Sequence, residues 1–338
     1  MFKNIIGQEN AKRELGFYVD SYKSTHIAPN LLFVGDKGQG KTTIAKEFAR
    51  ELVLFDEDGS VVINPETNRP RKKGFVEVNC STIKNVKAFI NAIIIPYVQD
   101  KDITILFDEA SEIPRDVTMA LLTILNPNSE NRTQFALDEY IVDFDFRRQT
   151  FLFATSESHL VFHALKDRLE QISLAPYTRE DLATIVQKNL VQEFVTKSGS
   201  VVTHETIPVQ LKDDVIFEVA SILRGNARAA QKMSVKIKQC LRGGLEFGRP
   251  QWEELKYALG IKPFGLNDIE INILKILAQT NEGTSLTALS AKTGLSREAL
   301  QRDCEIYIQR LGLMSIDTGG RIITTKGIEY LKALAQQA

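Results

Sequence analysis

Residues 35–42 constrain the fold of this chain more than any other segment. They read Gly-Asp-Lys-Gly-Gln-Gly-Lys-Thr and satisfy the pattern G-x-x-x-x-G-K-[ST]. An apolar run, Leu31–Val34, precedes them and a helical pattern follows, which is the strand–loop–helix context in which this pattern binds phosphate. Glycines let backbone N–H groups surround phosphate oxygens, and the helix start adds a positive dipole end. A chance glycine turn is the alternative, and the context disfavours it.

Three further apolar runs predict strands of the same sheet, at residues 75–78, 103–107 and 150–154. Helical patterns separate these runs, so the economical interpretation is an α/β domain whose parallel sheet is covered by helices. We expect this core to occupy residues 1–176. The irregular segment near residues 55–74 interrupts the pattern and is predicted to be an inserted hairpin.

The rest of the chain predicts two smaller domains. Residues 177–260 show helical periodicity and are expected to form a helical lid. Residues 261–338 contain a helix-turn-helix pattern in which Ser296 is expected to cap the second helix. A predicted hairpin, with strands at residues 313–316 and 321–324, completes a C-terminal domain that resembles a winged helix.

Composition narrows the possible functions. The 338 residues are 43% apolar, enough for two or three cores, and the formal net charge of -1 provides no global attraction to nucleic acid or acidic membranes. The three cysteines lie far apart and fit no metal-ligand spacing. No signal peptide opens the sequence and its apolar runs are too short to span a bilayer, so we expect a cytoplasmic protein without a membrane partner.

An acidic pair, Asp108 and Glu109, follows the predicted strand at residues 103–107. The carboxyl ends of parallel strands are where α/β sheets bind ligands. With the phosphate loop present, we expect Asp108 and Thr42 to hold Mg2+, Lys41 to reach the terminal phosphates, and Glu109 to polarise the attacking water. An acidic pair alone is more often the start of a solvated loop.

The segment before the phosphate loop, Phe-Lys-Asn-Ile-Ile-Gly-Gln at residues 2–8, resembles the adenine-side segment of AAA+ ATPases. Among these the RuvB family of branch-migration motors is the best match, and the resemblance spans nearly the whole chain. It implies an ATP site with Mg2+ whose nucleotide contacts come from Ile5, Ile6, Gly38, Gln39, Gly40, Lys41, Thr42, Thr43, Tyr177 and Arg228.

Further segments resemble the parts of this family that sense the nucleotide. Residues 150–156 and 165–169 resemble its sensor-1 strand and arginine-finger segment, which implies Ser156 as sensor 1 and Arg168 as the finger. Residues 176–182 and 224–228 resemble its lid entry and sensor-2 motif, which implies Tyr177 near the adenine and Arg228 as the sensing arginine. From the residues alone, a solvated helix-end arginine is the preferred interpretation of Arg168, and Tyr177 could equally be a core aromatic.

A finger acts on the neighbouring subunit's site, so the resemblance implies a homo-oligomeric, hexameric ring. The chain departs from the family pattern between residues 125 and 145, where polar residues 131–134 occupy the place of the apolar hairpin tip that docks the junction-binding partner RuvA. This departure places the RuvA partnership in doubt. Phe135 and Leu137 either dock a different adaptor or pack within their own hairpin.

The predicted winged helix carries few candidate DNA contacts. From Lys262 onward the sequence has 9 Lys or Arg and 8 Asp or Glu residues, a balance that favours weak DNA binding unless several subunits act together. The candidates are Arg297 and Arg302 on the second helix and Arg321 on the wing, although surface arginines are often merely solvated. The basic cluster at residues 69–73 is a further candidate with an open role.

Two functions follow from these patterns. The first is an oligomeric ATP-driven DNA motor resembling RuvB, which translocates duplex DNA or migrates branched junctions. The second is a loader or remodeller, similar to clamp or helicase loaders, that acts on a protein partner and uses the winged helix as an adaptor. A passive nucleotide switch is a weaker third interpretation, because it requires Glu109 to be dispensable.

Overall fold

The computed structural model describes residues 1–137, 140–198, 201–280 and 283–336. The chain divides into two compact units. One unit comprises Met1–Ile185 with Gly225–Lys232, and the other Val186–Arg224 with Met233–Ala338. Within the described ranges, no helix is long and apolar enough to cross a membrane.

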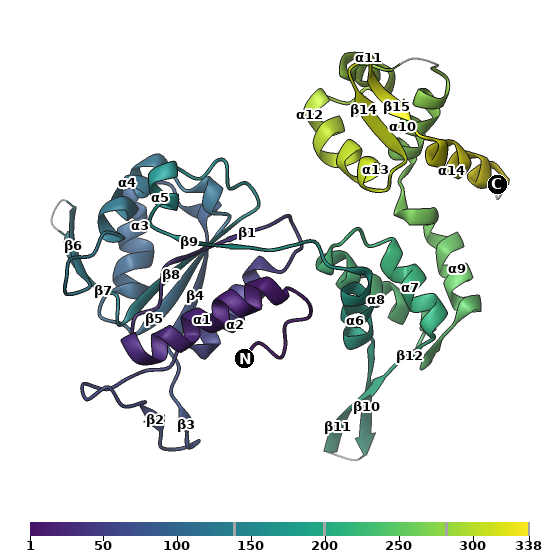
Figure 1. Cartoon of the computed structure of the whole chain (residues 1–338). Coiled ribbons are helices and arrows are strands. Elements are labelled where there is room, and N and C mark those ends of the chain that lie inside the picture. Colours follow the sequence, from purple (N-terminus) through teal and green to yellow (C-terminus); the bar gives the residue numbers. More distant parts are fainter. Residues whose placement is uncertain (138–139, 199–200, 281–282, 337–338) are drawn as a thin grey trace. The chain divides into compact units, whose positions relative to one another are not determined.

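A five-stranded parallel sheet organises the first unit, with the order β4–β5–β8–β1–β9 (Figure 1). All four strand pairs run parallel, as the sequence predicts, so the carboxyl ends of the strands lie at one edge. Asp108 at the end of β5 is in register with Asn79 of β4 and Ala154 of β8. The strands are β1 (Leu31–Val34), β4 (Gly74–Asn79), β5 (Ile103–Asp108), β8 (Gln149–Thr155) and β9 (Glu170–Ser173).

Helices cover both faces of this sheet and create two cores. Successive side chains of β8 alternate between them: Phe151 and Phe153 belong to one core, Leu152 and Ala154 to the other. This two-sided burial explains the continuous apolar runs in the sequence. The helices are α1 (Glu9–Thr25) and α2 (Lys41–Glu51) on one face, and α3 (Val86–Phe89), the π-helix η2 (Ile90–Val98), α4 (Arg115–Ile124) and α5 (His163–Lys166) on the other. Short 3-10 turns follow β4 and β5 at η1 (Cys80–Thr82) and η3 (Ala110–Glu112).

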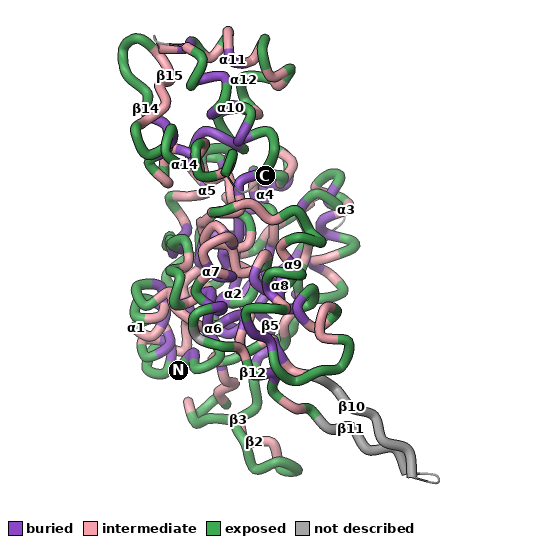
Figure 2. The backbone as a smooth tube through the Cα atoms, turned by 90° about the vertical axis from the view of Figure 1, so that its right-hand side faces the viewer, coloured by how far each residue is buried: buried purple, intermediate pink, exposed green. Residues whose placement is uncertain are grey.

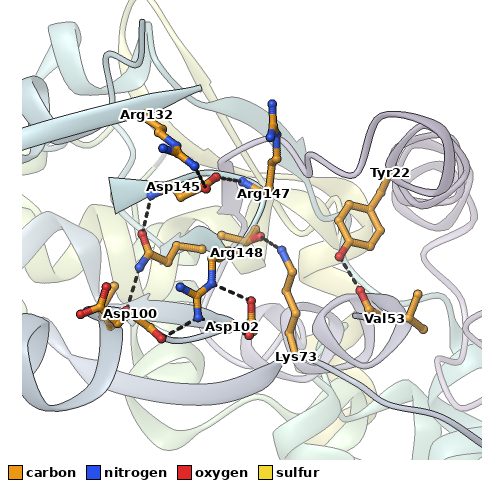
Figure 3. A network of polar contacts seen from close by, with 12 residues as sticks. Tyr22, Val53, Lys73, Asp100, Asp102, Arg132, Asp145, Arg147 and Arg148 are labelled. Atoms are coloured by element: carbon orange, nitrogen blue, oxygen red, sulfur yellow. Dashed lines mark hydrogen bonds and ion pairs between the residues drawn. The ribbon is translucent and has the colours of Figure 1, made fainter. Parts of the chain in front are cut away.

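Between α2 and β4 the chain forms the small antiparallel pair β2 (Ile63–Asn64) and β3 (Arg69–Pro70). Backbone bonds from Leu54 N to Arg71 O (2.8 Å) and from Lys73 N to Leu52 O (3.0 Å) tie its base to the end of α2. Figure 2 shows this pair largely exposed. Lys73, which follows this pair and precedes β4, is in contrast only 6% exposed, and its ammonium group lies over the ring of Tyr22 (Figure 3).

A second hairpin, β6 (Arg132–Leu137) with β7 (Tyr140–Asp145), precedes β8. Its ladder runs from the pair of Arg132 with Asp145 to the pair of Leu137 with Tyr140, and residues 138–139 between the strands lie outside the described residues. Residues 131–134 therefore lie at the base, where Arg132 also forms an ion pair with Asp145, and the prediction that they form the tip is wrong. The prediction failed because composition alone does not fix strand register.

The alternation of side chains along β6 explains what Phe135 and Leu137 do. Both are half-buried and pack against the core that contains Val142 and Phe144 of β7. They are therefore residues of the hairpin's own packing face. A polar network holds the base of this hairpin: Arg148 Nε donates to Asp102 Oδ1 (3.0 Å), and Arg148 Nη2 to the Asp100 carbonyl (2.6 Å) (Figure 3).

The lid region contains more than helices. Its helices are α6 (Arg179–Asn189), α7 (Asp213–Ser221), α8 (Ala227–Leu241) and α9 (Arg249–Leu259). The helical lid is confirmed, but β10 (Val191–Ser198) and β11 (Val201–Pro208) form an antiparallel ladder within it, which the helical expectation for residues 177–260 did not include. Residues 191–196 and 201–207 are rich in valine, threonine and phenylalanine, which favour strands. The short strands β12 (Gln210–Leu211) and β13 (Glu246–Phe247) pair in parallel.

The C-terminal part of the second unit is a winged helix, as predicted. Ser296 caps the second helix of the helix-turn-helix, because its hydroxyl accepts a bond from Ala299 N (3.1 Å). That helix contains a π-helical stretch between two α-helical ends. The elements are η4 (Pro263–Gly265), α10 (Asp268–Ala278), α11 (Leu286–Thr293), α12 (Arg297–Ala299), η5 (Leu300–Glu305), α13 (Ile306–Arg310), β14 (Met314–Asp317), β15 (Gly320–Ile323) and α14 (Thr325–Gln336).

Candidate active site

The phosphate loop, residues 35–40, connects β1 to α2 and requires glycine at two points. Gly38 and Gly40 have φ of 86° and 85°, a left-handed conformation that other residues rarely adopt. A Cβ on Gly38 would lie 2.2 Å from Asn226 Oδ1, and one on Gly40 would lie 2.8 Å from Tyr177 Oη. The loop is therefore closely overlaid by Tyr177 and by the segment before α8.

Lys41 begins α2 and is held against its own loop. Its Nζ donates to the carbonyls of Gly35 (2.7 Å) and Asp36 (3.1 Å). Burial lowers the pKa of Lys41, while the nearby carboxylates of Asp108 and Asp36 oppose that shift. An anion entering the loop would replace the two carbonyls as the partner of this ammonium group and favour its charged form.

Asp108 links the phosphate loop to the end of β5. Thr42 Oγ1 donates to Asp108 Oδ2 (2.9 Å), and Glu109 N donates to Asp108 Oδ1 (3.0 Å). A hydroxyl and a carboxylate at this separation are the hard oxygen donors that Mg2+ prefers, so these residues fit a magnesium ion. Glu109 has φ of 57°, a conformation that costs about 1 kcal/mol or more in a residue other than glycine and is typical of functional sites.

At the end of β8, the two neighbouring hydroxyl residues Thr155 and Ser156 differ in burial and in their contacts. Thr155 is 1% exposed, and its Oγ1 lies 3.2 Å from Ser111 Oγ while accepting a bond from Glu157 N (3.0 Å). Ser156 is half-buried and lines the cavity. Ser156 is therefore the hydroxyl available to a ligand, whereas Thr155 fixes the strand end against η3.

These groups surround one cavity of about 460 Å3. It brings together the predicted residues Lys41, Asp108, Glu109, Ser156 and Arg228, the last from the first turn of α8. The full lining is Lys37, Gly38, Gly40, Lys41, Thr42, Thr43, Asp108, Glu109, Ser111, Glu112, Thr155, Ser156, Glu157, Ala227, Arg228 and Gln231. Sequence reasoning missed four lining residues that belong to no phosphate-site motif: Ser111, Glu112, Glu157 and Gln231.

Asn226 is a further contact that sequence reasoning did not single out. Its Nδ2 donates to Lys37 O (2.8 Å), and the next residue, Ala227, donates its N–H to Gly38 O (3.0 Å). The first turn of α8 is thus bonded directly to the phosphate loop. The position of Asn226 directly before the helical pattern predicts its cap of α8, since asparagine favours helix starts, but does not predict its bond to the phosphate loop.

Several predicted nucleotide contacts do not line this cavity among the residues that the structure describes. Ile5 is 8% exposed and packs in a core, and Ile6 is half-buried. Gln39 is 4% exposed and accepts a bond from Asp36 N (2.8 Å), so its side chain supports the loop from within. Tyr177 is half-buried, its hydroxyl lies above Gly40, and burial raises the pKa of its phenol.

Arg168 lies away from this cavity in its own chain. Its Nε donates to Leu122 O (3.1 Å) at the end of α4, and its Nη1 donates to Ala164 O (2.7 Å) in α5. It is half-buried, so the interpretation of a freely solvated arginine does not hold. Two bonds to rigid backbone fix the direction of its guanidinium group.

Arg321 differs from the exposed wing cation that the sequence suggested. Its side chain is only 12% exposed and forms a two-point ion pair with Glu305, from Nε to Oε1 (2.8 Å) and from Nη2 to Oε2 (3.0 Å). Arg321 is therefore not the exposed cation that the prediction of a DNA contact assumed. It packs the wing onto the helix instead. Arg297 and Arg302 are both exposed on the second helix of the helix-turn-helix.

The parallel sheet, the phosphate loop and the acidic strand end together define a P-loop ATPase of the AAA+ class. Residues 31–177 match the family described as "ATPase family associated with various cellular activities (AAA)", and residues 263–332 match the "RuvB C-terminal winged helix domain". The second match narrows the class, because it adds the RuvB type of winged helix to the ATPase core. The chain is a RuvB-like AAA+ ATPase.

Relatives match over almost the full length. The RuvB subunit of the Holliday junction branch migration complex from Thermosipho melanesiensis is 24% identical, with 98% of this chain and 97% of the relative covered. The corresponding subunit from Fusobacterium nucleatum is 22% identical over 98% of this chain and 91% of its own. A solved structure of the Thermotoga maritima RuvB Holliday junction branch migration motor shares the fold with a TM-score of 0.68 at 21% identity, covering 97% of this chain and 95% of that one.

Proposed function

We propose that this chain is an ATP-driven motor that moves duplex DNA and migrates branched junctions. The observation that carries the proposal is the single cavity in which the phosphate loop, the acidic end of β5 and Arg228 of α8 meet. This cavity supports ATP hydrolysis that the lid senses through Arg228. The winged helix supplies a DNA-binding fold. The relatives named as branch-migration subunits support the same activity.

In the proposed site, backbone N–H groups of the phosphate loop, Lys41 and Thr43 bind the phosphates. Thr42 and Asp108 would hold Mg2+, which when bound neutralises charge on the β- and γ-phosphate oxygens. Glu109 orients and polarises the attacking water, while Ser156 and Arg228 contact the γ-phosphate. Ile5, Ile6 and Tyr177 are proposed to border the adenine. Support for Tyr177 is its hydroxyl above Gly40.

We propose that Arg168 acts in the site of a neighbouring subunit of a hexameric ring. Its bonds to Leu122 and Ala164 use Nε and Nη1, and no hydrogen bond from Nη2 is found within the described residues. A guanidinium group held in this way needs little reorganisation to stabilise charge on a phosphate that a partner subunit presents.

Mixing two inactive variants tests the shared site. Arg168→Ala should abolish DNA-stimulated ATPase activity, and so should Lys41→Ala. In an equal mixture about one interface in four joins an intact phosphate loop to an intact finger, so part of the activity should return. A mixture that stays as inactive as either variant refutes the shared-site proposal.

Protein remodelling is the second candidate function, and the Arg321–Glu305 pair favours it because the pair withdraws a wing cation from the surface. Salt dependence separates the two functions. A motor that uses Arg297 and Arg302 on DNA must bind duplex or junction DNA with an affinity that falls as salt rises, and Arg297→Gln should reduce that slope by about one charge. Gel-shift titrations at two salt concentrations measure this; affinity that does not change with salt favours the protein remodeller.

The β6–β7 hairpin bears on the adaptor. It carries the ion pair Arg132–Asp145 and the hydrogen bond from Gln134 to Asp143 (2.9 Å), with Ile141 as an exposed apolar residue. We propose that an adaptor docks here chiefly through polar contacts. Pull-down of a RuvA protein by this chain, and its loss on Ile141→Asp, would instead indicate the apolar docking mode.

A further inference from the structure

Residues 224–228 form a short segment whose two ends are fixed to different parts of the molecule. On the nucleotide side, Asn226 donates to Lys37 O (2.8 Å), Ala227 donates to Gly38 O (3.0 Å), and Arg228 lines the cavity. This end of the segment is therefore bonded directly to the phosphate loop, through which a bound nucleotide would act on it.

Arg224, at the other end, is bound inside the second unit by groups of the winged helix. Its Nη1 and Nη2 donate to the two carboxylate oxygens of Glu270 (2.8 and 2.7 Å), and Nη2 also donates to the Gly265 carbonyl. The guanidinium carbon lies 4.2 Å from the centre of the Tyr307 ring. A planar two-point pair stacked on an aromatic ring holds its partner in one orientation, which lysine could not do.

Glu270 ties this arginine to the start of α10. The carboxylate, 0% exposed, also accepts a bond from Asn267 N (2.8 Å), while Glu270 N donates to Asn267 Oδ1 (2.8 Å). One carboxylate thus serves as the helix cap and as the arginine's partner. Tyr307 belongs to α13, which directly continues the second helix of the helix-turn-helix.

The backbone that joins Arg224 to Asn226 is conformationally restricted. Arg224 and Gly225 have φ of 56° and 72°, so two consecutive residues are left-handed. Gly225 O accepts a bond from Tyr177 N (3.2 Å), and a Cβ on Gly225 would lie 3.0 Å from Pro176 Cβ. A non-glycine residue persists in this conformation only where its surroundings hold it, and Arg224 is held by Glu270 and Tyr307.

We propose that Arg224 is a positioning residue that transmits the state of the nucleotide site to the winged helix. It does so by fixing the segment that carries Asn226 and Arg228 to the first turn of α10 and to α13. The proposal rests on the proposed motor function for its consequence, the movement of DNA. Breaking the pair would leave ATP binding and hydrolysis in place and uncouple them from the winged helix.

Hydrogen–deuterium exchange of the full chain tests the link without DNA. In the wild type, adding ATPγS with Mg2+ should change the exchange rate of amides 266–271 about fivefold or more, the range of an ordinary coupling between sites. Arg224→Gln and Glu270→Gln should both remove this response while retaining nucleotide affinity. Glutamine at position 270 can still cap α10, so Glu270→Gln is informative even where Arg224→Gln folds poorly.

Glu305→Gln is the matched control, because Glu305 is a buried glutamate in a two-point pair with an arginine of the same domain but far in sequence from residues 224–228. It should keep the nucleotide response. The proposal is overturned if the wild type shows no response at residues 266–271, if either variant retains it, or if Glu305→Gln loses it equally. Failure of the motor function would appear separately, as wild-type protein that hydrolyses ATP without moving branched DNA.

Discussion

Lys73 provides a quantitative test of the packing at the amino-terminal edge of the sheet. It follows the inserted β2–β3 segment and is only 6% exposed, with Nζ 5.0 Å from the centre of the Tyr22 ring and bonded to Thr150 Oγ1 (3.3 Å). Burial lowers the pKa of Lys73 to about 8, although Asp102 and Asp145 favour the charged form. The perturbation is Lys73→Met, which keeps the apolar stem and removes the charge.

The sign follows from which state binds more protons. Between about pH 8 and pH 10.4 the unfolded chain holds the Lys73 proton more often than the folded chain, so the free energy of unfolding rises with pH. Below pH 8 the full cost of burying the charge is present, and above about pH 10.4 it disappears. A shift of this size corresponds to about 3 kcal/mol. The variant also loses the hydrogen bond to Thr150, which lowers its gain in the free energy of unfolding by about 1 kcal/mol at every pH.

Urea unfolding of the full chain at pH 7, 8, 9 and 10 measures this difference. Lys73→Met should be more stable than the wild type by about 1–2 kcal/mol at pH 7, and the gain should vanish toward pH 10. Lys72→Met is the control, because Lys72 is the exposed neighbour and its substitution should leave the pH profile unchanged. Wild-type and Lys73→Met curves that stay parallel from pH 7 to pH 10 would refute the assigned pKa and its cause.

Two further predictions concern the nucleotide site. Glu109→Gln should lower the rate of ATP hydrolysis by about 100-fold or more while nucleotide binding persists, because the group that polarises water is lost; normal hydrolysis in a steady-state assay would support the passive switch instead. Gly38→Ala should weaken ATP binding at least about tenfold, since its Cβ would lie 2.2 Å from Asn226 Oδ1 at a φ of 86°. Fluorescent-nucleotide titration measures it against Gly16→Ala, where a Cβ meets nothing within 4 Å, and equal affinity in the two variants would contradict the steric argument.

Much of the fold could be predicted because its determinants are local. Four of the five strands of the sheet contain apolar runs followed by turn or polar residues, whereas β9 (Glu170–Ser173) has one buried apolar residue and was not predicted. The phosphate loop could be predicted because Gly38 and Gly40 supply the left-handed backbone that it requires. Ser296 predicts a helix start for the same reason, since its capping bond joins residues three positions apart. The core of the candidate site, Lys41 with Asp108, follows from motifs of this kind.

Features that depend on tertiary contacts could not be predicted in this way. The β6–β7 register is set by which residues face the core, so polar residues 131–134 were placed at the tip although they lie at the base. The β10–β11 ladder pairs residues 191–198 with residues 201–208, a pairing that the local helical patterns on either side of it did not indicate. Asn226 bonds to a loop 189 positions earlier in the chain, a contact that no local pattern encodes.

The arginines of the winged helix show that tertiary contacts, which the sequence does not predict, also decide which charges are available for function. Arg321 carries the charge expected of a DNA contact, but Glu305 holds it inside the domain, and Glu270 is buried in the same way against Arg224. Two of the eight acids and one of the nine bases after residue 261 are therefore removed from the surface, which raises the domain's remaining charge from +1 to +2. A charge this small gives each winged helix a shallow salt dependence on its own. For the proposed DNA motor, a steep dependence would come from several subunits that bind one duplex together, which links weak DNA contacts to the same ring that is proposed for Arg168.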